Sequence, residues 1–203
     1  MTEAGVRVLG ICGSPRLEST DYAVHEALTY AQEHHGAAVE YFSARRKVVK
    51  FCRHCDYCIR KQQGCVQKDD LVELYPKMQW ANAWILGSPC YQGQITAQLK
   101  AILDRCRALV AQNPKVFQNK VGAGIAVGGD RAGGQEHVLH SMIDFYLINE
   151  MIPVGGGSFG ANLGATLWSK DQGAEGAKAD KEGLASIRRV VDRMVGVVRL
   201  LNV

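Results

Sequence analysis

The chain has 203 residues, of which 47% are apolar and 22% charged, which is enough for one domain with a substantial core. Its formal net charge of +4 is modest and its basic residues are scattered, so composition gives little support to nucleic-acid binding. The first apolar segment is too short for a secretory signal, and no run is long enough to span a membrane. We therefore expect a single domain, residues 1–203, in a cytoplasmic protein without membrane contact.

The N-terminal part reads as strand, loop, helix and strand. Residues 6–12 form a short apolar run typical of a buried strand. The periodic segment after it predicts a helix with Ser19 or Thr20 as N-cap and Gly36 as a left-handed stop. Residues 37–43 predict a second strand.

The middle of the chain continues this alternation. Asp69 and Asp70 are suited to cap a helical turn, and Pro76 is expected to break or kink that helix because proline lacks a backbone donor. Residues 83–89 predict a third strand. Apolar residues at three- and four-residue spacing then predict one long helix over residues 95–110.

The C-terminal part repeats the pattern once more. Residues 120–128 predict a fourth strand, residues 135–150 a helix, and the region near Pro153 a short fifth strand. The glycine-, alanine- and lysine-rich residues 169–180 predict a surface loop, and an amphipathic helix is expected over residues 184–201.

Strands that alternate with helices indicate a parallel sheet, because parallel strands need crossover connections. We therefore expect an α/β protein with a flavodoxin-like, doubly wound, five-stranded parallel sheet. In such sheets the ligand lies beyond the carboxyl ends of the strands, where the strand order reverses. The loops after strands one, three and four should then build one site.

The loop after the first strand, GSPRLEST, supplies hydroxyl groups, an arginine and a helix N-terminus, which together favour an anion such as a phosphate. It has neither the Gly-Lys-Ser/Thr ending of a Walker loop nor the spaced glycines of a dinucleotide fingerprint. An ordinary capped turn remains the alternative for this loop alone. The loops SPCYQGQ and GGDRAGGQE follow the third and fourth strands and, converging on the same edge, suit a planar cofactor.

Four cysteines lie within fourteen residues, in the pattern C-x2-C-x2-C-x6-C. They are Cys52, Cys55, Cys58 and Cys65. A disulfide framework is disfavoured in a chain without an export signal. A short irregular loop of thiolates suits an iron–sulfur cluster, whereas a structural zinc site usually has two separated C-x2-C knuckles. The spacing therefore favours a [4Fe-4S] cluster and leaves zinc and free or redox-active thiols as alternatives.

Three segments, GSPR with the following ST, LGSPCYQGQITAQLKAILDR and VGGDRAGGQE, resemble the NADPH-dependent FMN reductase family. The compact cysteine run followed by CVQKDD resembles more specifically the iron–sulfur flavoprotein branch, whose members carry FMN and a [4Fe-4S] cluster. This resemblance implies that the FMN phosphate is held by Ser14, Arg16, Ser19 and Thr20. It implies that the isoalloxazine is lined by Pro89, Cys90, Tyr91, Gln92 and Gly93, and by Gly128, Gly129, Asp130, Gly133 and Gly134. Cys90 and Gln92 depart from the residues usual in relatives.

The resemblance implies an electron-transfer flavoprotein that moves electrons between a one-electron donor, such as a ferredoxin, and a second acceptor. Relatives suggest a homodimer or homotetramer. We expect the cysteine loop, residues 50–68, to emerge at the same sheet edge as the flavin loops, so that cluster and flavin exchange electrons within a subunit or across a dimer. The main alternative is a cluster-free NAD(P)H-dependent FMN or quinone reductase, and a metal-stapled binding module without enzymatic activity is a further one.

Overall fold

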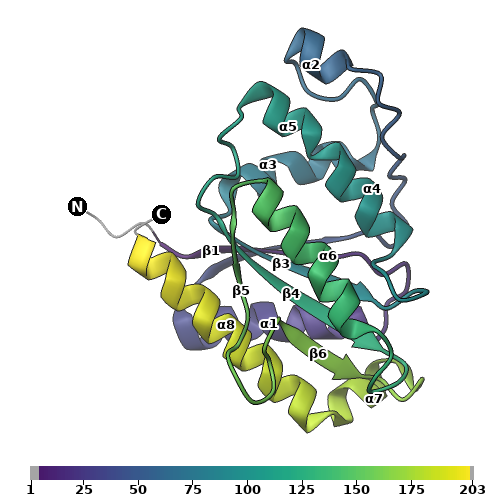
Figure 1. The fold of residues 1–203 in the computed structure, drawn as a ribbon, viewed down its shortest axis with the longest axis vertical. Coiled ribbons are helices and arrows are strands. Elements are labelled where there is room, and N and C mark those ends of the chain that lie inside the picture. Colours follow the sequence, from purple (N-terminus) through teal and green to yellow (C-terminus); the bar gives the residue numbers. More distant parts are fainter. Residues whose placement is uncertain (1–4, 202–203) are drawn as a thin grey trace.

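The computed structural model describes residues 5–201, which form a twisted parallel sheet between two layers of helices (Figure 1). The strands are β1 (Arg7–Cys12), β2 (Ala38–Ser43), β3 (Ala83–Pro89), β4 (Val121–Gly128), β5 (Ile152–Val154) and β6 (Ala165–Trp168). Their order is β2-β1-β3-β4-β5, with β6 also paired to β4, and every pairing is parallel. This arrangement confirms the predicted flavodoxin-like sheet.

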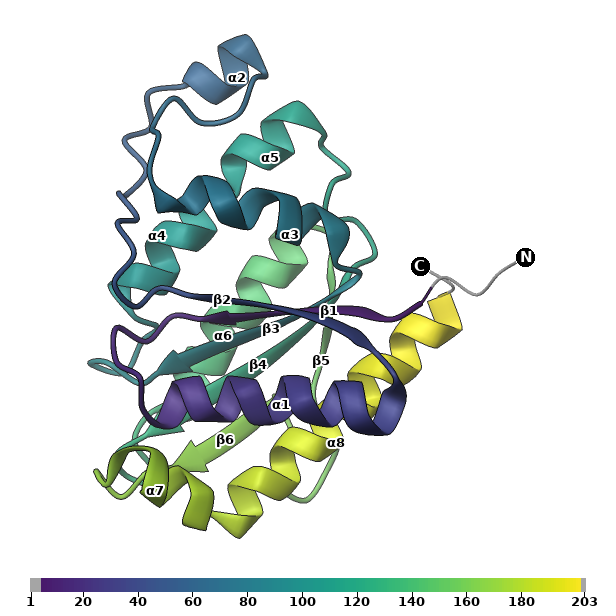
Figure 2. The same ribbon diagram turned by 180° about the vertical axis from the view of Figure 1, so that it is seen from behind.

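The helices divide between the two faces of the sheet (Figure 2). They are α1 (Ser19–His35), α2 (Tyr57–Lys61), α3 (Leu74–Trp80), α4 (Ala97–Arg105), α5 (Arg107–Gln112), α6 (Gln135–Ile148), α7 (Gly173–Ala179) and α8 (Lys181–Leu201), with a 3₁₀ turn, η1 (Asp70–Glu73). Helices α1, α7 and α8 cover one face, while α3, α4, α5 and α6 cover the other. Within residues 5–201, no helix is long and apolar enough to cross a bilayer.

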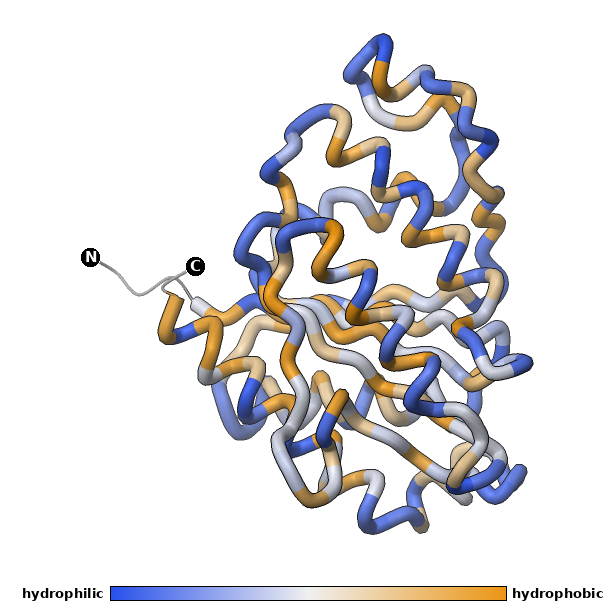
Figure 3. Tube along the Cα trace, viewed as in Figure 1, coloured by the Kyte–Doolittle hydropathy of each residue, from blue (hydrophilic) through white to orange (hydrophobic). Residues whose placement is uncertain are grey.

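Side chains of β1 pack into the hydrophobic cores on both faces of the sheet. Val8 and Cys12 join the core under α1 and α8, whereas Leu9 and Ile11 join the core under α3 and α4. Successive side chains of a strand point to opposite faces, so a strand covered on both sides must be apolar throughout. Figure 3 shows the result as hydrophobic colour along the central strands and hydrophilic colour over much of the outer loops.

Helix α1 lies unusually close to the sheet. A Cβ placed on Gly87 would overlap Cγ2 of Val24, and one on Gly10 would lie 2.8 Å from Cδ1 of Leu28. Both strand positions therefore need glycine for packing. Gly36 ends the helix in the left-handed conformation at φ 66°, as predicted.

Two helix predictions are wrong in detail. The N-cap of α1 is Glu18, and Ser19 is the first helical residue. Pro76 does not break a helix but lies in the first turn of α3, directly after η1. The first-turn amides of a helix have no intrahelical partner, so a proline there removes no hydrogen bond.

The predicted long helix over residues 95–110 is two helices. Thr96 caps α4 by accepting a hydrogen bond from the amide of Leu99, and α4 ends at Cys106. There the amide of Cys106 bonds to the carbonyl of Leu103, a tightened turn that separates α4 from α5. Helix α5 then packs against α2 of the cysteine loop.

The predicted surface loop at residues 169–180 is also wrong, because most of it is helix α7. Ala177 of α7 is fully buried, and its first turn is tied to the loop after β1, where the Glu18 carboxylate accepts from the amide of Ala174 at 3.1 Å. The predicted short strand near Pro153 is confirmed as β5, and β6, a strand that was not predicted, pairs with the next part of β4. Composition alone misses both features because they depend on contacts distant in sequence.

Candidate functional site

A pocket lies where β1, β3 and β4 end, at the sheet edge where the strand order reverses. It has a volume of about 140 Å³. Its walls come from Ser14, Arg16, Glu18, Ser19, Thr20, Pro89, Cys90, Tyr91, Val127, Gly128, Gly129, Ser169 and Asp171. Cofactor sites usually enclose roughly 300–1,000 Å³. The closed part therefore suits a phosphate-sized group, with the remainder of a larger ligand in the open part of the cleft.

The loop after β1 forms the polar side of this pocket. Its Ser14 hydroxyl accepts from the amide of Arg16 at 3.1 Å, which turns the chain toward α1. Ser19 and Thr20 are buried in the pocket wall, and their hydroxyls make no hydrogen bond to other residues in the part of the chain described. These free donors, the Arg16 guanidinium and the amides at the start of α1 fit an anion.

A tight turn after β3 forms the second side. The backbones of Tyr91 and Gln94 exchange two hydrogen bonds of 3.0 Å around Gln92 and Gly93. Both turn residues have positive φ, 50° and 75°, as in the two-residue turns that join twisted strands. The turn leaves the Tyr91 ring partly exposed beside the pocket.

Cys90 links this turn to the loop after β4. Its amide donates to the carbonyl of Val127 at 2.9 Å, and its thiol donates to the carbonyl of Gly133 at 2.8 Å. The thiol therefore holds two predicted flavin loops together, a role that the sequence did not indicate for Cys90 when it predicted this residue to line the isoalloxazine.

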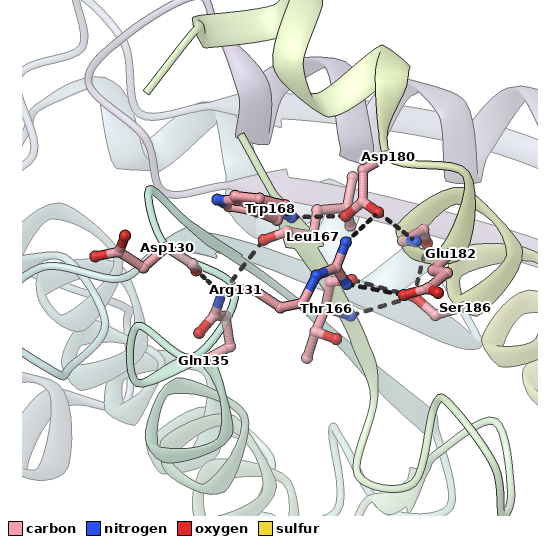
Figure 4. A network of polar contacts seen from close by, with 10 residues as sticks. Asp130, Arg131, Gln135, Thr166, Leu167, Trp168, Asp180, Glu182 and Ser186 are labelled. Atoms are coloured by element: carbon pink, nitrogen blue, oxygen red, sulfur yellow. Dashed lines mark hydrogen bonds and ion pairs between the residues drawn. The ribbon is translucent and has the colours of Figure 1, made fainter. Parts of the chain in front are cut away.

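Gln135 shapes the loop after β4 from within. Its side chain accepts from the amide of Gly133 at 2.8 Å and donates to the carbonyl of Asp130 at 2.6 Å. In Figure 4 the Gln135 amide also reaches the carbonyl of Leu167 in β6, a 3.4 Å contact. The loop is thus bound to the end of β6.

Asp180, which is buried, anchors the same wall at the start of α8 (Figure 4). Its carboxylate accepts from the amide of Trp168 at 2.7 Å and from the guanidinium of Arg131 at 3.2 Å. Arg131 also pairs with Glu182 at 3.0 Å. The cations of Arg131 and Lys170 lie 5.0 and 4.7 Å from the centre of the Trp168 ring. These contacts fix the segment that carries Ser169 and Asp171.

Nine of the fourteen predicted cofactor residues line the pocket: Ser14, Arg16, Ser19, Thr20, Pro89, Cys90, Tyr91, Gly128 and Gly129. Gln92, Gly93, Asp130, Gly133 and Gly134 lie in the same loops but outside its lining. Sequence reasoning missed Glu18, Val127, Ser169 and Asp171. Ser169 and Asp171 carry no local signal, because only the pairing of β6 with β4 brings them to this edge. Of the two missed carboxylates, Glu18 lies 4.0 Å from Arg16.

A larger groove of about 830 Å³ lies between α4, α5 and α6. Its walls include Ile95, Leu103, Val110, Phe145 and Ile148. None of the predicted cofactor residues contributes to it. The smaller pocket is the better candidate, because it lies at the carboxyl ends of the parallel strands and has converging polar groups.

The four cysteines lie on the cysteine loop, with Cys58 in α2. Each is a free thiol; Cys55 is exposed and the other three are partly exposed. Within residues 5–201, no three histidine, cysteine, aspartate or glutamate side chains converge as metal ligands do. Four accessible thiols on one loop fit a [4Fe-4S] cluster in chemistry and number. Their side chains still have to come together around it.

A cation of α5 lies near these thiols. Arg107 pairs with Asp56 at 2.7 Å. The hydrogen bond to Asp56 raises the pKa of Arg107, and the charges of Cys58 and Cys52 add to this effect. Positive charge therefore faces the thiols from a helix that the sequence pattern assigned only to the core.

The expected closeness of cysteine loop and flavin pocket is not observed within the chain. The segment leaves β2 at the pocket edge, where the amide of Ala44 bonds to the carbonyl of Cys12 at 2.8 Å. It then rises over α4, and α2 lies beyond α5 at one end of the long axis, whereas β6 and α7 lie at the other (Figure 1). The cysteines are carried away from the sheet edge because α2 packs on α5.

Cys12 and Cys106 are buried, as predicted. Burial raises the pKa of Cys12 to about 11 and that of Cys106 still higher. Both remain protonated at neutral pH, and a thiol must lose its proton to bind a metal. Neither is a ligand candidate.

The sheet order and the pocket at its edge define a flavodoxin-like protein with a polar cleft at the carboxyl ends of its strands. Solved structures share this fold at low sequence identity. A WrbA-like flavodoxin from Agrobacterium tumefaciens has a TM-score of 0.65 and 15% identity, over 97% of this chain and 99% of that one. RosB has a TM-score of 0.75 and 17% identity, over 97% and 80%.

Residues 6–166 match the model of the NADPH-dependent FMN reductase family. An iron–sulfur flavoprotein of Methanocaldococcus jannaschii is 56% identical over 194 residues, 96% of this chain and 98% of the relative. An iron–sulfur flavoprotein of Archaeoglobus fulgidus is 47% identical over 195 residues, 96% and 98%. The chain therefore belongs to the iron–sulfur flavoprotein branch of the NADPH-dependent FMN reductase family, which confirms the resemblance drawn from its loops.

Proposed function

We propose that this protein is an FMN- and [4Fe-4S]-containing flavoprotein that transfers electrons between a one-electron donor and a second acceptor. The observation that carries the proposal is the pairing, on one flavodoxin-like fold, of an anion-binding pocket with a separate loop of four free thiols. Bound FMN supplies one- and two-electron chemistry, and the cluster supplies one-electron transfer.

The pocket residues bind and orient the FMN. Ser14, Arg16, Ser19 and Thr20 bind the phosphate through hydroxyls, a guanidinium and the α1 amides. Residues 89–93 and 128–134 line the isoalloxazine. The thiol of Cys90 joins these two loops, and the side chain of Gln135 holds the second one in shape.

Cys52, Cys55, Cys58 and Cys65 are the proposed ligands of the cluster. All four thiols are free and at least partly exposed, so they are accessible to a cluster. Arg107 offsets part of the negative charge of a thiolate-ligated cluster.

Because the cysteine loop and the pocket lie apart in one chain, exchange between the flavin of one subunit and the cluster of another is the better route. This arrangement requires the expected homodimer or homotetramer. We place the protein in the cytoplasm, with a redox protein such as a ferredoxin as partner and neither nucleic acid nor membrane as ligand.

The experiment is an anaerobic visible spectrum of the purified protein, with analysis of FMN, iron, acid-labile sulfide and zinc. We expect flavin bands over broad thiolate-to-iron absorption, with iron and sulfide in equal amounts. A protein with FMN but without iron would instead be the cluster-free NAD(P)H-dependent FMN or quinone reductase. A protein with zinc and no flavin would be a metal-stapled module.

A further inference from the structure

Arg105, the last residue of α4, is buried although it carries a charge. Only 1% of its side chain is exposed, and its partner Asp69 is 2% exposed. Burying a charge pair costs free energy that the attraction between the charges often fails to recover, so such a pair is weak evidence of added stability. The Nε atom of Arg105 moreover has no hydrogen-bond partner within residues 5–201. The position of this guanidinium needs an explanation other than core stability.

The guanidinium joins the two ends of the cysteine loop. Its Nη1 donates to the carbonyl of Lys50 at 3.1 Å and to the Asp69 carboxylate, and its Nη2 donates to the carbonyl of Gln67 at 3.2 Å. The same carboxylate accepts from the amide of Lys50 at 2.9 Å. The incoming and outgoing chains thus meet on one planar group with fixed donors.

Beyond these end contacts the loop is held by α2, which packs on α5, and by the pair of Asp56 with Arg107 at 2.7 Å. No residue from 50 to 68 is buried, and α2 has only five residues. The side chain of Gln67 donates to the carbonyl of Phe51 at 3.0 Å, next to the guanidinium contacts. The entropy lost when a loop of this length closes opposes an ordered loop, so its order depends on the contacts at its ends.

We propose that Arg105 is a positioning residue that joins the two ends of the cysteine loop, residue 50 and residues 67–69, which form its neck. This clamp sets Cys52 and Cys65 at the separation that a metal centre requires. Cys52 follows Lys50 by two residues and Cys65 precedes Gln67 by two, so the clamp controls the distance between the first and last thiol. Burial lowers the pKa of Arg105, but the hydrogen bond that it donates to Asp69 outweighs this effect and raises the pKa, and the charge of Cys65 acts in the same direction. The inference rests on the proposed function, since it concerns the same four thiols.

The test separates the clamp from a simple ion pair. Arg105→Met combined with Asp69→Asn removes both buried charges but keeps one of the two side-chain oxygens that accept from the amides of Lys50 and Leu71. Arg105→Lys keeps the charge but not the planar set of donors. Lys100→Met is the control, because it removes an exposed cation that pairs with Asp104 on the same helix.

Three readouts are compared on full-length protein: denaturant unfolding, amide hydrogen exchange over residues 50–70, and Co²⁺ titration of metal-free protein, followed through thiolate-to-cobalt absorption. We expect the double variant to unfold close to wild type, while exchange at Lys50 becomes about tenfold faster or more and Co²⁺ binds about tenfold more weakly. Arg105→Lys should show the same faster exchange at Lys50 and weaker Co²⁺ binding as the double variant. Lys100→Met should match wild type in both measurements.

A stable double variant with wild-type exchange at Lys50 and wild-type Co²⁺ affinity would overturn the clamp. Wild-type exchange and Co²⁺ affinity in Arg105→Lys would also overturn the clamp, because a positive charge alone would then suffice. Wild-type protein that binds neither Co²⁺ nor iron would instead overturn the proposed function, while exchange at Lys50 would still decide whether Arg105 closes the neck.

Discussion

At the scale of single residues, the proposed chemistry depends on a few side chains whose environments differ sharply. The seven cysteines lie in three environments. Cys12 and Cys106 are buried, Cys90 joins two pocket loops, and four thiols lie on the cysteine loop. Sequence spacing separates the last four correctly, because local crowding is visible without a structure. The role of Cys90 depends on the carbonyl of Gly133, a residue 43 positions away, and spacing could not reveal it.

Replacing both Ser14 and Arg16 with alanine is expected to weaken FMN binding. A hydroxyl and a cation would be lost from the pocket at the start of α1. Hydrogen bonds to charged groups contribute about 1.5–3 kcal/mol each, so losing two of them, about 3–6 kcal/mol, should lower the affinity by about a hundredfold or more. FMN fluorescence titration measures this, with Arg188→Ala, an exposed arginine of α8, as the control. Unchanged affinity in the double variant would remove this loop from the site.

Replacing Cys58 with alanine is expected to remove most iron and sulfide while FMN stays bound. The thiol lies on the cysteine loop, and the FMN pocket is built from other loops, so the two losses should separate. Because the domain has a large core of its own, the variant should remain folded. Iron, sulfide and FMN analyses check this. His54→Asn is the control, because asparagine tolerates the left-handed backbone at this position, φ 50°.

If Cys58→Ala kept its full iron content, Cys58 would not be a ligand. If FMN were lost together with iron, the two sites would be coupled more closely than their separation in the structure indicates.

At the scale of elements, periodicity predicts which segments are helix or strand better than where they end. The helices α1, α6 and α8 and the strands β1 to β4 lie close to their predicted positions. The break between α4 and α5 was missed, because an apolar stripe continues across Cys106 and only the packing of α5 on α2 redirects the chain. Helix α7 was missed because its short, glycine-rich segment depends on tertiary contacts for stability.

The contact between α1 and the sheet gives a test at this scale. Gly87→Ala is expected to destabilise the fold by about 1–3 kcal/mol, because the new methyl group would overlap Val24. Gly196→Ala in α8 is the matched substitution, since nothing lies within 4 Å of its added Cβ. Alanine is favoured over glycine inside a helix by about 0.5–1 kcal/mol, so this variant should be more stable than wild type.

Denaturant unfolding of both variants supplies the measurement. Equal stability changes in the two would show that α1 does not pack on β3 as closely as the structure has it.

At the scale of the whole molecule, the distance between the cysteine loop and the pocket governs how electrons would move. Exposed Lys50, Arg53, Arg60 and Lys61 lie on the cysteine loop, whose helix α2 is at the far end of the molecule from α7. A basic surface attracts an acidic protein partner and accelerates its association at low salt. We therefore expect an acidic one-electron protein donor to dock at this end of the molecule.

We accordingly expect NADPH to reduce the flavin slowly compared with a reduced ferredoxin. Stopped-flow reduction of wild type and of Cys58→Ala by each donor makes the comparison. Ferredoxin reduction should slow as ionic strength rises, because the Debye length shortens. Rapid reduction of the Cys58→Ala flavin by NADPH would favour the cluster-free reductase instead.

The sequence by itself determined the alternation of strands and helices, the flavodoxin-like class, the three loops beyond the carboxyl ends of β1, β3 and β4, and the cysteine set. These properties follow from local periodicity and spacing, and the parallel sheet follows because such an alternation needs crossover connections. Tertiary structure alone decided that β6 brings Ser169 and Asp171 to the pocket, and that α2 packs on α5, away from it. It also placed Arg105 at the neck of the cysteine loop, 36 residues from Asp69. Such placements depend on the burial of groups distant in sequence, which leaves no mark on the local pattern.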